Sequence, residues 1–278
     1  MPRVELPQGT LHYRDEGEGP VVVLVHGLLV DGTLWSRVQP LLAGCRVLIP
    51  DLPLGSHRTA MRPDADLTPA GLARLVADFL VALDLAEVTL VGNDTGGAIC
   101  QITAADHPER IGRLVLTNCD AYRNFLPLAF RPLQLLPRIP GAVWTLAKTA
   151  HLAPVRAAFG VLTSDPLPPD LYAGWAEPIR TNPGVRRDVA KVMRGITTRE
   201  TMRAIEILRG FDRPTLIVWG RKDRFFAPKF AERLAADIPG ARLEWLPDAH
   251  TFTPLDAPEQ LAALITEFAT DKAVPHNA

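Results

Sequence analysis

The sequence predicts an α/β fold with a doubly wound, mostly parallel sheet. Short continuous runs of apolar and β-branched residues recur along the chain, as in Val21–Val25, and such runs are typical of strands buried on both faces. Segments with helical spacing lie between these runs, as between Pro69 and Leu83. Strands that alternate with helices in this way favour parallel pairing, with helices covering both faces of the sheet.

The expected elements follow one another in order. Strands are expected at residues 21–25, 46–49, 88–91, 114–116, 215–219 and 242–246. Helices are expected at residues 33–42, 68–83, 228–236 and 257–269, and one more ends near residue 106. The second of these helices has a start signal, because Pro69 occupies the first helical position after Thr68. The alternation of Thr10–Arg14 predicts one or two antiparallel edge strands within residues 1–15.

Residues 121–210 interrupt the alternation. Ten of the 26 prolines fall in this segment, no buried-strand signal does, and stretches such as Leu133–Leu152 have helical periodicity. We therefore predict a helical cap over 121–210, inserted in an α/β core of residues 1–120 and 211–270, with a flexible tail at 271–278. Open α/β sheets hold their ligands beyond the carboxyl ends of the strands, so we expect the cap to lie over a ligand site.

The composition indicates a globular protein with a large core. The chain of 278 residues is 47% hydrophobic and 22% charged, which excludes a disordered chain. Its net charge of -1 and the lack of a polybasic run argue against nucleic acid and an anionic membrane as partners. The three cysteines show neither zinc spacing nor a disulfide pattern, and no secretory signal or apolar span of roughly 18–20 residues is visible. We therefore expect a cytoplasmic protein without a metal site.

One polar residue lies at the centre of a sharp turn between a strand and a helix. In the sequence VGNDTGG, glycines stand two residues before and two residues after Asp94. A tight turn of this kind needs residues without a Cβ around a strained centre, and it pushes the central side chain out at the carboxyl edge of the sheet. The pattern is that of a nucleophile elbow. The alternative is that Asp94 only caps the helix, as Asp often does at such a position.

Two more functional side chains follow later strands. Asp223 comes just after the strand at 215–219, and His250 comes after the next strand. The chain order is then nucleophile, acid and histidine, all at the same edge of the sheet, as in a catalytic triad. The backbone N–H groups of Leu28 and Thr95 are expected to point into the same crevice and to form an oxyanion hole.

These features together resemble the α/β-hydrolase family. The resemblance covers nearly the whole chain and rests on HG at 26–27, DLPLGS at 51–56, GNDTGG at 92–97, WGRKD at 219–223, DAHTF at 248–252 and LDAPEQL at 255–261. An elbow centred on Asp is similar to that of the epoxide hydrolase and haloalkane dehalogenase branch. By this resemblance Asp94, Asp223 and His250 are the catalytic residues, and residues 121–210 are the helical cap.

The chemistry agrees with that branch. A carboxylate is poorly suited to attack an ester, because it would form an anhydride, but it can displace a leaving group from a saturated carbon and form an alkyl ester. His250 would then activate water against that ester, and the amides of Leu28 and Thr95 would hold the tetrahedral oxygen. Asp223 would orient His250 and stabilise its charged form.

The sequence departs from the branch at several positions. Haloalkane dehalogenases of this type usually have Trp where this chain has Thr95, and often Asn where it has Leu28. Residues 92–100 contain no Arg of the kind that fluoroacetate dehalogenases use for a substrate carboxylate. Epoxide hydrolases often have Pro where this chain has Leu29. Because the halide-binding side chains are absent, we rank epoxide hydrolysis slightly above dehalogenation.

Cap residues are candidates for substrate binding. Epoxide hydrolases use cap tyrosines to protonate the epoxide oxygen, and the segment offers Tyr122 and Tyr172. Trp144 and Trp175 are further candidates for the pocket lining, although a buried aromatic side chain is more often simple packing. Asp120 follows the strand at 114–116 and is an alternative to Asp223 as the acid.

Two other functions stay open at this point. One is ester or lactone hydrolysis, or a lyase reaction, with Asp94 as a general base. The other is a non-catalytic ligand-binding relative, which the presence of all three catalytic residue types argues against. The expected partners are a small apolar organic substrate and water, with no cofactor, nucleic acid or membrane. The oligomeric state does not follow from the sequence.

Overall fold

The predicted sheet is present and has eight strands. The computed structural model describes the main chain of residues 1–271 and the side chains of all of these except 154 and 158. The strand order is β1-β2-β4-β3-β5-β6-β7-β8, in which β2 pairs antiparallel with β1 and β4 and the remaining pairs are parallel. The bounds are β1 Arg3–Leu6, β2 Gly9–Glu16, β3 Val21–Val25, β4 Arg46–Pro50, β5 Val88–Asp94, β6 Ile111–Cys119, β7 Thr215–Gly220 and β8 Arg242–Leu246.

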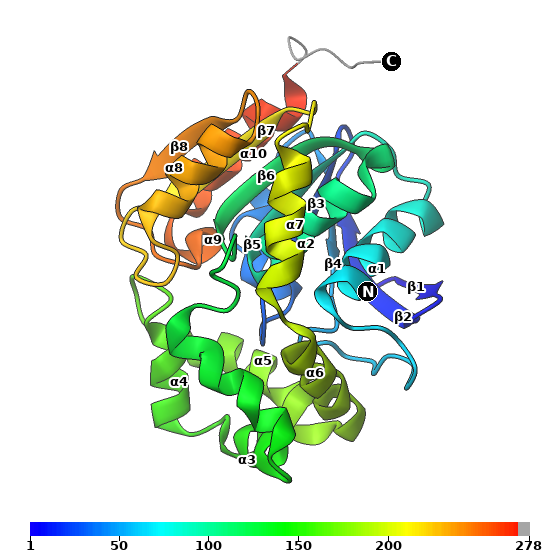
Figure 1. Cartoon of the computed structure of the whole chain (residues 1–278), viewed down its shortest axis with the longest axis vertical. Coiled ribbons are helices and arrows are strands. Elements are labelled where there is room, and N and C mark those ends of the chain that lie inside the picture. Colours follow the sequence, from blue (N-terminus) through cyan, green and yellow to red (C-terminus); the bar gives the residue numbers. More distant parts are fainter. Residues whose placement is uncertain (272–278) are drawn as a thin grey trace.

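Helices cover both faces of the sheet (Figure 1). The core helices are α1 (Pro69–Ala82), α2 (Thr95–Asp106), α7 (Thr198–Leu208), α8 (Pro228–Asp237), α9 (Thr253–Asp256) and α10 (Pro258–Thr270). In β3, Val23 and Val25 pack into the apolar cluster under α1, α2, α7 and α8, while Val22 and Leu24 pack into the cluster under α9 and α10. Both faces of the strand are buried, which explains its continuous apolar run.

The cap lies beyond the carboxyl ends of the strands (Figure 1). It contains the 3₁₀ segment η4 (Leu128–Arg138) and the helices α3 (Ala142–Thr149), α4 (Ala153–Gly160), α5 (Pro169–Thr181) and α6 (Pro183–Gly195). The last helix of the predicted cap segment, α7, has a different position from the others. It packs against α2 beside the sheet. The predicted cap segment 121–210 thus includes α7, a helix that lies beside the sheet, in addition to the helices that end with α6 at Gly195.

Two other expectations concern the segment 33–42 and the C-terminal tail. The helix expected at residues 33–42 is replaced by two short 3₁₀ segments, η1 (Gly32–Trp35) and η2 (Gln39–Leu41); a third, η3 (Pro108–Arg110), precedes β6. Pro40 lies inside the expected helix, where it removes a backbone donor. The flexible tail predicted for 271–278 lies outside the described residues except for Asp271. No helix of residues 1–271 is long and apolar enough to cross a membrane.

Candidate active site

Asp94 occupies a strained turn between β5 and α2. Its backbone has φ 55° and ψ -132°, a conformation that L-residues rarely adopt. The flanking glycines permit the turn: a Cβ on Gly96 would lie 2.4 Å from the carbonyl oxygen of His26, and one on Gly97 would lie 2.3 Å from the Cβ of Cys119. The side chain of Asp94 makes no capping hydrogen bond to α2. Asp94 is the N-cap residue of α2 by position, but helix capping does not account for its side chain.

The backbone donors expected around Asp94 are in place. The N–H of Leu28 donates to Asp94 Oδ2 at 3.1 Å, and the N–H of Thr95 also stabilises the charged carboxylate. Burial outweighs these donors and raises the pKa of Asp94 to about 7. The loop that carries Leu28 approaches so closely that a Cβ on Gly27 would lie 2.0 Å from Asp94 Oδ2. Asp94 is thus held in one position and is half-ionised near neutral pH.

A cavity of about 370 Å³ opens beside Asp94. Its lining comes from the loop after β3, the elbow, the loop after β7 and the cap: Leu28, Leu29, Asp94, Thr95, Leu126, Pro127, Phe130, Leu133, Leu146, Val155, Phe159, Leu162 and Phe226. Asp94 and Thr95 are the only polar residues among them. A small apolar molecule fits this lining. Its binding would remove few polar groups of the protein from water without giving them a new hydrogen-bond partner. Leu126, Pro127 and Phe130 belong to the apolar run 125–130 of the sequence, a signal for the cavity lining that we did not use in predicting the site.

Asp223 lies just after β7, as expected, but both of its carboxylate oxygens already accept hydrogen bonds from groups other than His250. Oδ1 accepts hydrogen bonds from the N–H groups of Phe225 and Phe226 at 2.7 and 2.9 Å, and Oδ2 accepts from Asn118 Nδ2 at 2.7 Å. Burial raises the pKa of this carboxyl group. Asp223 makes no hydrogen bond to His250 in the part of the chain that the structure describes.

His250 lies after β8, in a loop that is tied to the elbow. Asn93, next to Asp94, donates from Nδ2 to the carbonyl oxygen of Thr251 at 2.9 Å. The nucleophile candidate and the histidine loop therefore meet at one sheet edge.

The carboxylate found beside His250 is Asp256 of α9. Its Oδ2 accepts a hydrogen bond from the His250 N–H at 2.7 Å and lies 3.4 Å from His250 Nδ1. Its Oδ1 accepts from the N–H and Oγ of Ser164, a cap residue, at 2.9 and 3.0 Å. We did not assign a role to Asp256 from the sequence, although it lies within the quoted LDAPEQL segment.

Asp120, the alternative acid, lies behind the elbow. It is fully buried, its Oδ2 accepts a hydrogen bond from Thr95 Oγ1 at 3.1 Å, and its Oδ1 has no partner. Burial, with the nearby charge of Asp94, raises the pKa of Asp120 well above its usual range. Asp120 therefore lies in a setting that disfavours its charged form, and its carboxyl group fixes the side chain of Thr95.

The four aromatic candidates of the cap lie outside the main cavity. Tyr122 donates from its hydroxyl to Asp237 at 3.0 Å, and Trp144 is 54% exposed. Tyr172 and Trp175 line a neighbouring pocket of about 30 Å³. The Tyr172 hydroxyl donates to the carbonyl oxygen of Ala150, and Trp175 Nε1 donates to Thr33 Oγ1 at 2.7 Å. None of the four presents a free polar group to Asp94.

Known proteins resemble this chain over nearly its whole length. A family model described as alpha/beta hydrolase fold matches residues 20–258. An uncharacterised protein of Mycobacterium tuberculosis is 28% identical over 92% of this chain and 77% of its own. Haloalkane dehalogenase 2 of the same organism is 27% identical over 94% of this chain and 91% of its own. The crystal structure of an alpha/beta hydrolase fold protein from Burkholderia ambifaria has a TM-score of 0.83 at 26% identity, covering 95% of this chain and 96% of that one. The chain, a hydrolase by these relationships, belongs to the alpha/beta hydrolase fold family.

Proposed function

We propose that this hydrolase forms a covalent alkyl ester on Asp94 and acts on a small apolar alkyl halide. The observation that carries the proposal is the carboxylate at the strained elbow, held by backbone N–H groups and facing an otherwise apolar cavity. The similarity to a haloalkane dehalogenase over 94% of the chain supports the same reaction class.

The first step is a displacement at saturated carbon. Oδ1 of Asp94 attacks the carbon, a C–O bond forms, and the halide leaves with the electron pair of the carbon–halogen bond. Oδ2, held by the N–H of Leu28 at 3.1 Å, becomes the carbonyl oxygen of the ester. The apolar lining excludes water at this stage, and the carboxylate attacks without a competing hydration shell.

The second step hydrolyses the ester. His250 takes a proton from water, which attacks Cγ of Asp94, and the negative charge moves to Oδ2 beside the N–H donors of Leu28 and Thr95. When the intermediate collapses, the alcohol leaves with Oδ1 and takes the proton back from His250. The new carboxyl group keeps the oxygen of the water and releases the remaining proton to solvent, which restores the carboxylate of Asp94. Asp223 remains the proposed partner of the charged His250.

The positions of the cap tyrosines favour a halide over an epoxide. An epoxide oxygen leaves as a strongly basic alkoxide and needs a proton donor, whereas a halide leaves as a weak base. The chain has three tyrosines. Tyr13 packs edge-to-face on Phe79 in the core. The hydroxyls of Tyr122 and Tyr172 donate hydrogen bonds to Asp237 and to the carbonyl oxygen of Ala150, neither of which lines the cavity. This reverses the ranking expected from the sequence.

A single turnover in heavy-oxygen water tests the covalent route. With enzyme in excess over a short bromoalkane, we expect the alcohol to carry oxygen from Asp94 and the enzyme to gain the label. The label is then located by mass spectrometry of the peptide that contains Asp94. Label in the first-turnover alcohol would mean that Asp94 acts as a general base, which is the alternative function.

The rate of alkylation should follow the ionisation of Asp94. Because only the carboxylate attacks and its pKa is raised to about 7, we expect the single-turnover rate to be about tenfold lower at pH 6 than at pH 8. The measurement is halide release by rapid mixing between pH 5 and 9. A rate that stays constant across this range would contradict the assignment of Asp94 as the attacking group.

Asp256 should affect hydrolysis of the ester more than its formation. It holds the main chain of His250, so we expect Asp256→Asn to slow ester hydrolysis about tenfold and to leave alkylation unchanged. Asp223→Asn is the matched comparison, and its loss should be larger if Asp223 stabilises the charged histidine. The two steps are separated by pre-steady-state halide and alcohol release. Equal slowing of both steps by Asp256→Asn would indicate a general loss of structure.

A further inference from the structure

One part of the cap carries positive charge without any negative charge. Between Asp120 and Asp165 the sequence contains no acidic residue, and we call residues 121–164 the basic cap segment. Its five cations, all exposed, are Arg123, Arg131, Arg138, Lys148 and Arg156. None of them forms an ion pair with a carboxylate within residues 1–271: Arg131 donates to the main-chain carbonyls of Arg123 and Leu126, and Lys148 lies over the Trp144 ring. No ion pair among the described residues therefore neutralises these five cations.

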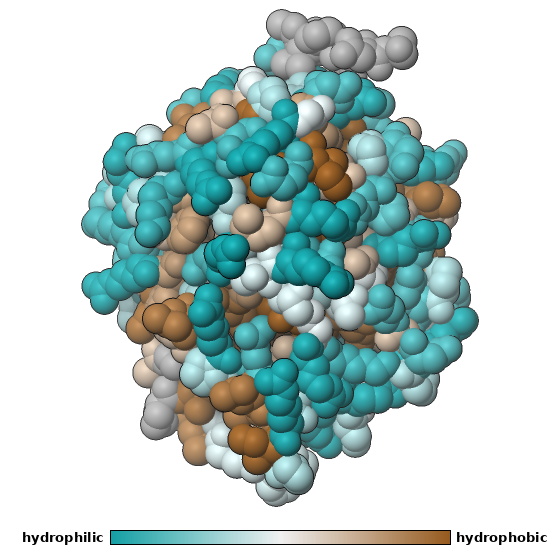
Figure 2. Space-filling view, viewed as in Figure 1, coloured by the Kyte–Doolittle hydropathy of each residue, from teal (hydrophilic) through white to brown (hydrophobic). Residues whose placement is uncertain are grey.

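The basic cap segment also exposes large apolar side chains. Of ten such side chains in the part of the chain that the structure describes, six belong to it: Leu128, Leu135, Ile139, Trp144, Leu152 and Val161. Leu128 is 75% exposed and Trp144 is 54% exposed. Figure 2 shows brown apolar groups beside teal polar ones over the region of α3 and α4. Exposed apolar groups gathered in this way mark an interaction surface.

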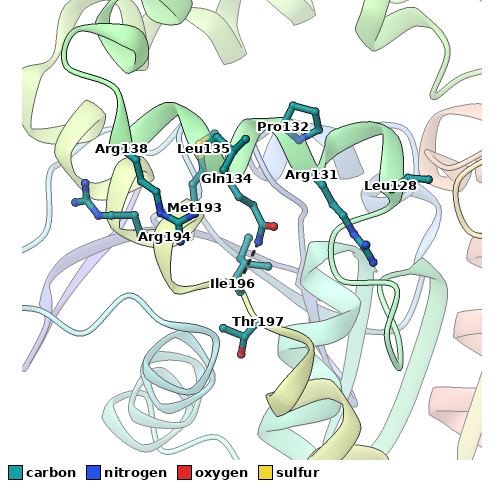
Figure 3. A pocket seen from close by; sticks show the side chains of 10 residues that line it. All are labelled: Leu128, Arg131, Pro132, Gln134, Leu135, Arg138, Met193, Arg194, Ile196 and Thr197. Carbon is teal, nitrogen blue, oxygen red and sulfur yellow. Dashed lines mark hydrogen bonds between the residues drawn. The ribbon is translucent and has the colours of Figure 1, made fainter.

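The η4 segment arranges both kinds of side chain on its outer face. Leu128, Arg131, Leu135 and Arg138 follow one another at intervals of three or four residues and line a groove of about 440 Å³. Figure 3 shows Leu128 and Arg131 at one end of this groove and Arg138 beside Arg194 of α6 at the other. Two arginines gathered without a carboxylate repel each other, so an anion in the groove would relieve that repulsion.

The inner faces of the same elements form the cavity beside Asp94. Phe130 and Leu133 of η4, Leu146 of α3, and Val155 and Phe159 of α4 all line it. A single layer of backbone thus separates the exposed apolar and basic surface from the apolar cavity.

We propose that the basic cap segment docks on the surface of an anionic phospholipid bilayer. Arginine and lysine side chains would meet the lipid phosphates, with a headgroup in the groove of η4, while Leu128, Leu135 and Trp144 enter the boundary between headgroups and acyl chains. This is surface docking by short helices and not a membrane span. It revises the expectation of no membrane partner, which rested on the net charge of the whole chain and on the lack of a polybasic run.

Charge distinguishes this partner from a second copy of the chain. A two-fold symmetric dimer through this surface would place five cations against five cations with no acid between them. An anionic bilayer offers opposite charge and an apolar layer below it, which matches both features of the surface. An apolar substrate dissolved in the bilayer would lie next to the cavity wall, a consequence that rests on the proposed function.

Vesicle binding tests the proposal without any substrate. Wild-type protein is sedimented with vesicles of phosphatidylcholine alone and of phosphatidylcholine with about one quarter phosphatidylglycerol. We expect binding to the anionic vesicles and little to the neutral ones, weakening as salt is added. Arg138→Gln with Lys148→Gln should lower the partition coefficient about 25-fold, since each cation contributes about fivefold near an anionic surface. Neither residue lines the cavity, so turnover of a water-soluble substrate should be unchanged.

A control removes the same charge elsewhere. Arg3 on β1 and Arg62 in the loop that contacts its hairpin are exposed. Arg3→Gln with Arg62→Gln has the same net charge as the test variant, and we expect its binding to stay within about twofold of wild type. Equal loss in both double variants, or a wild-type dimer that does not bind anionic vesicles, would overturn the proposal. Bromine-labelled lipid provides a second readout, because it should quench fluorescence of the wild type and not of Trp144→Phe.

Discussion

Replacing Asp94 by Asn should abolish alkylation while leaving the fold intact. An amide cannot displace a halide from saturated carbon, so we expect kcat/KM to fall by about 10⁴-fold or more, to the level of the uncatalysed reaction. Halide release and the intact mass of the protein after mixing with substrate provide the measurement. A variant that keeps even a hundredth of the activity would contradict the role of Asp94 as nucleophile.

The same substitution should stabilise the protein above neutral pH. The pKa of Asp94 is raised in the folded state, so folding takes up a proton at this site, and stability declines as pH rises from the unfolded value near 4 to the folded value of about 7. Asn is uncharged at every pH, so its burial carries no cost in free energy that grows with pH. We therefore expect the free energy of unfolding of Asp94→Asn to exceed that of wild type by on the order of a few kcal/mol at pH 8, with the difference vanishing toward pH 4.

Thermal unfolding from pH 4 to pH 8 gives the comparison. Asp64→Asn is the matched control, because it removes an exposed carboxylate and should leave Tm almost unchanged at every pH. If Asp94→Asn were less stable than wild type at pH 8, the carboxylate would have to be stabilised in its charged form, contrary to the raised pKa.

The second large effect concerns His250. Alkylation needs only the carboxylate, whereas hydrolysis of the ester needs a base for water. We expect His250→Gln to release one equivalent of halide at the normal rate and then to stop, with kcat lower by about 10³-fold. The intact protein should gain the mass of the alkyl group, located on Asp94 by peptide mapping.

A double variant controls for alkylation elsewhere. Asp94→Asn combined with His250→Gln should neither release halide nor gain mass. Sustained turnover by His250→Gln at the wild-type rate, with no adduct, would remove His250 from the mechanism and point to another base.

The elbow could be predicted from sequence because its causes are local. A buried strand, glycines at fixed spacing and a following helix all lie within about twenty residues, and the close contacts of Gly96 and Gly97 explain why no larger residue stands there. The parallel pairing of the strands from β3 to β8 follows from the same local alternation of strands and helices. The position of His250 after a strand end is local too.

The partners of the site side chains could not be predicted in this way. Tyr122 is in the cap sequence, but its hydroxyl contacts Asp237 of α8, more than a hundred residues later. Asp256 lies only six residues after His250, but its contact with the His250 N–H depends on how the chain turns into α9, which the residue pattern alone does not specify. The net charge of the whole chain hid the basic cap segment for a similar reason, because acids elsewhere in the sequence cancel its five cations in the sum without pairing with them in the described part of the chain.

The cap and the histidine loop are joined by hydrogen bonds, and this limits how the cap can change. The Phe252 N–H donates to the carbonyl oxygen of Leu162 at 2.9 Å, and Ser164 donates twice to Asp256, which also holds His250. Leu162 lines the cavity as well. In the proposed mechanism, the cavity lining and the loop of the water-activating histidine therefore depend on the same short stretch of chain. If the cap were exchanged for that of a relative to alter specificity, the new cap would have to reproduce the hydrogen bonds of positions 162 and 164 to the histidine loop. Without them the pocket would change as intended, but His250 would lose the position that the proposed hydrolysis of the ester requires.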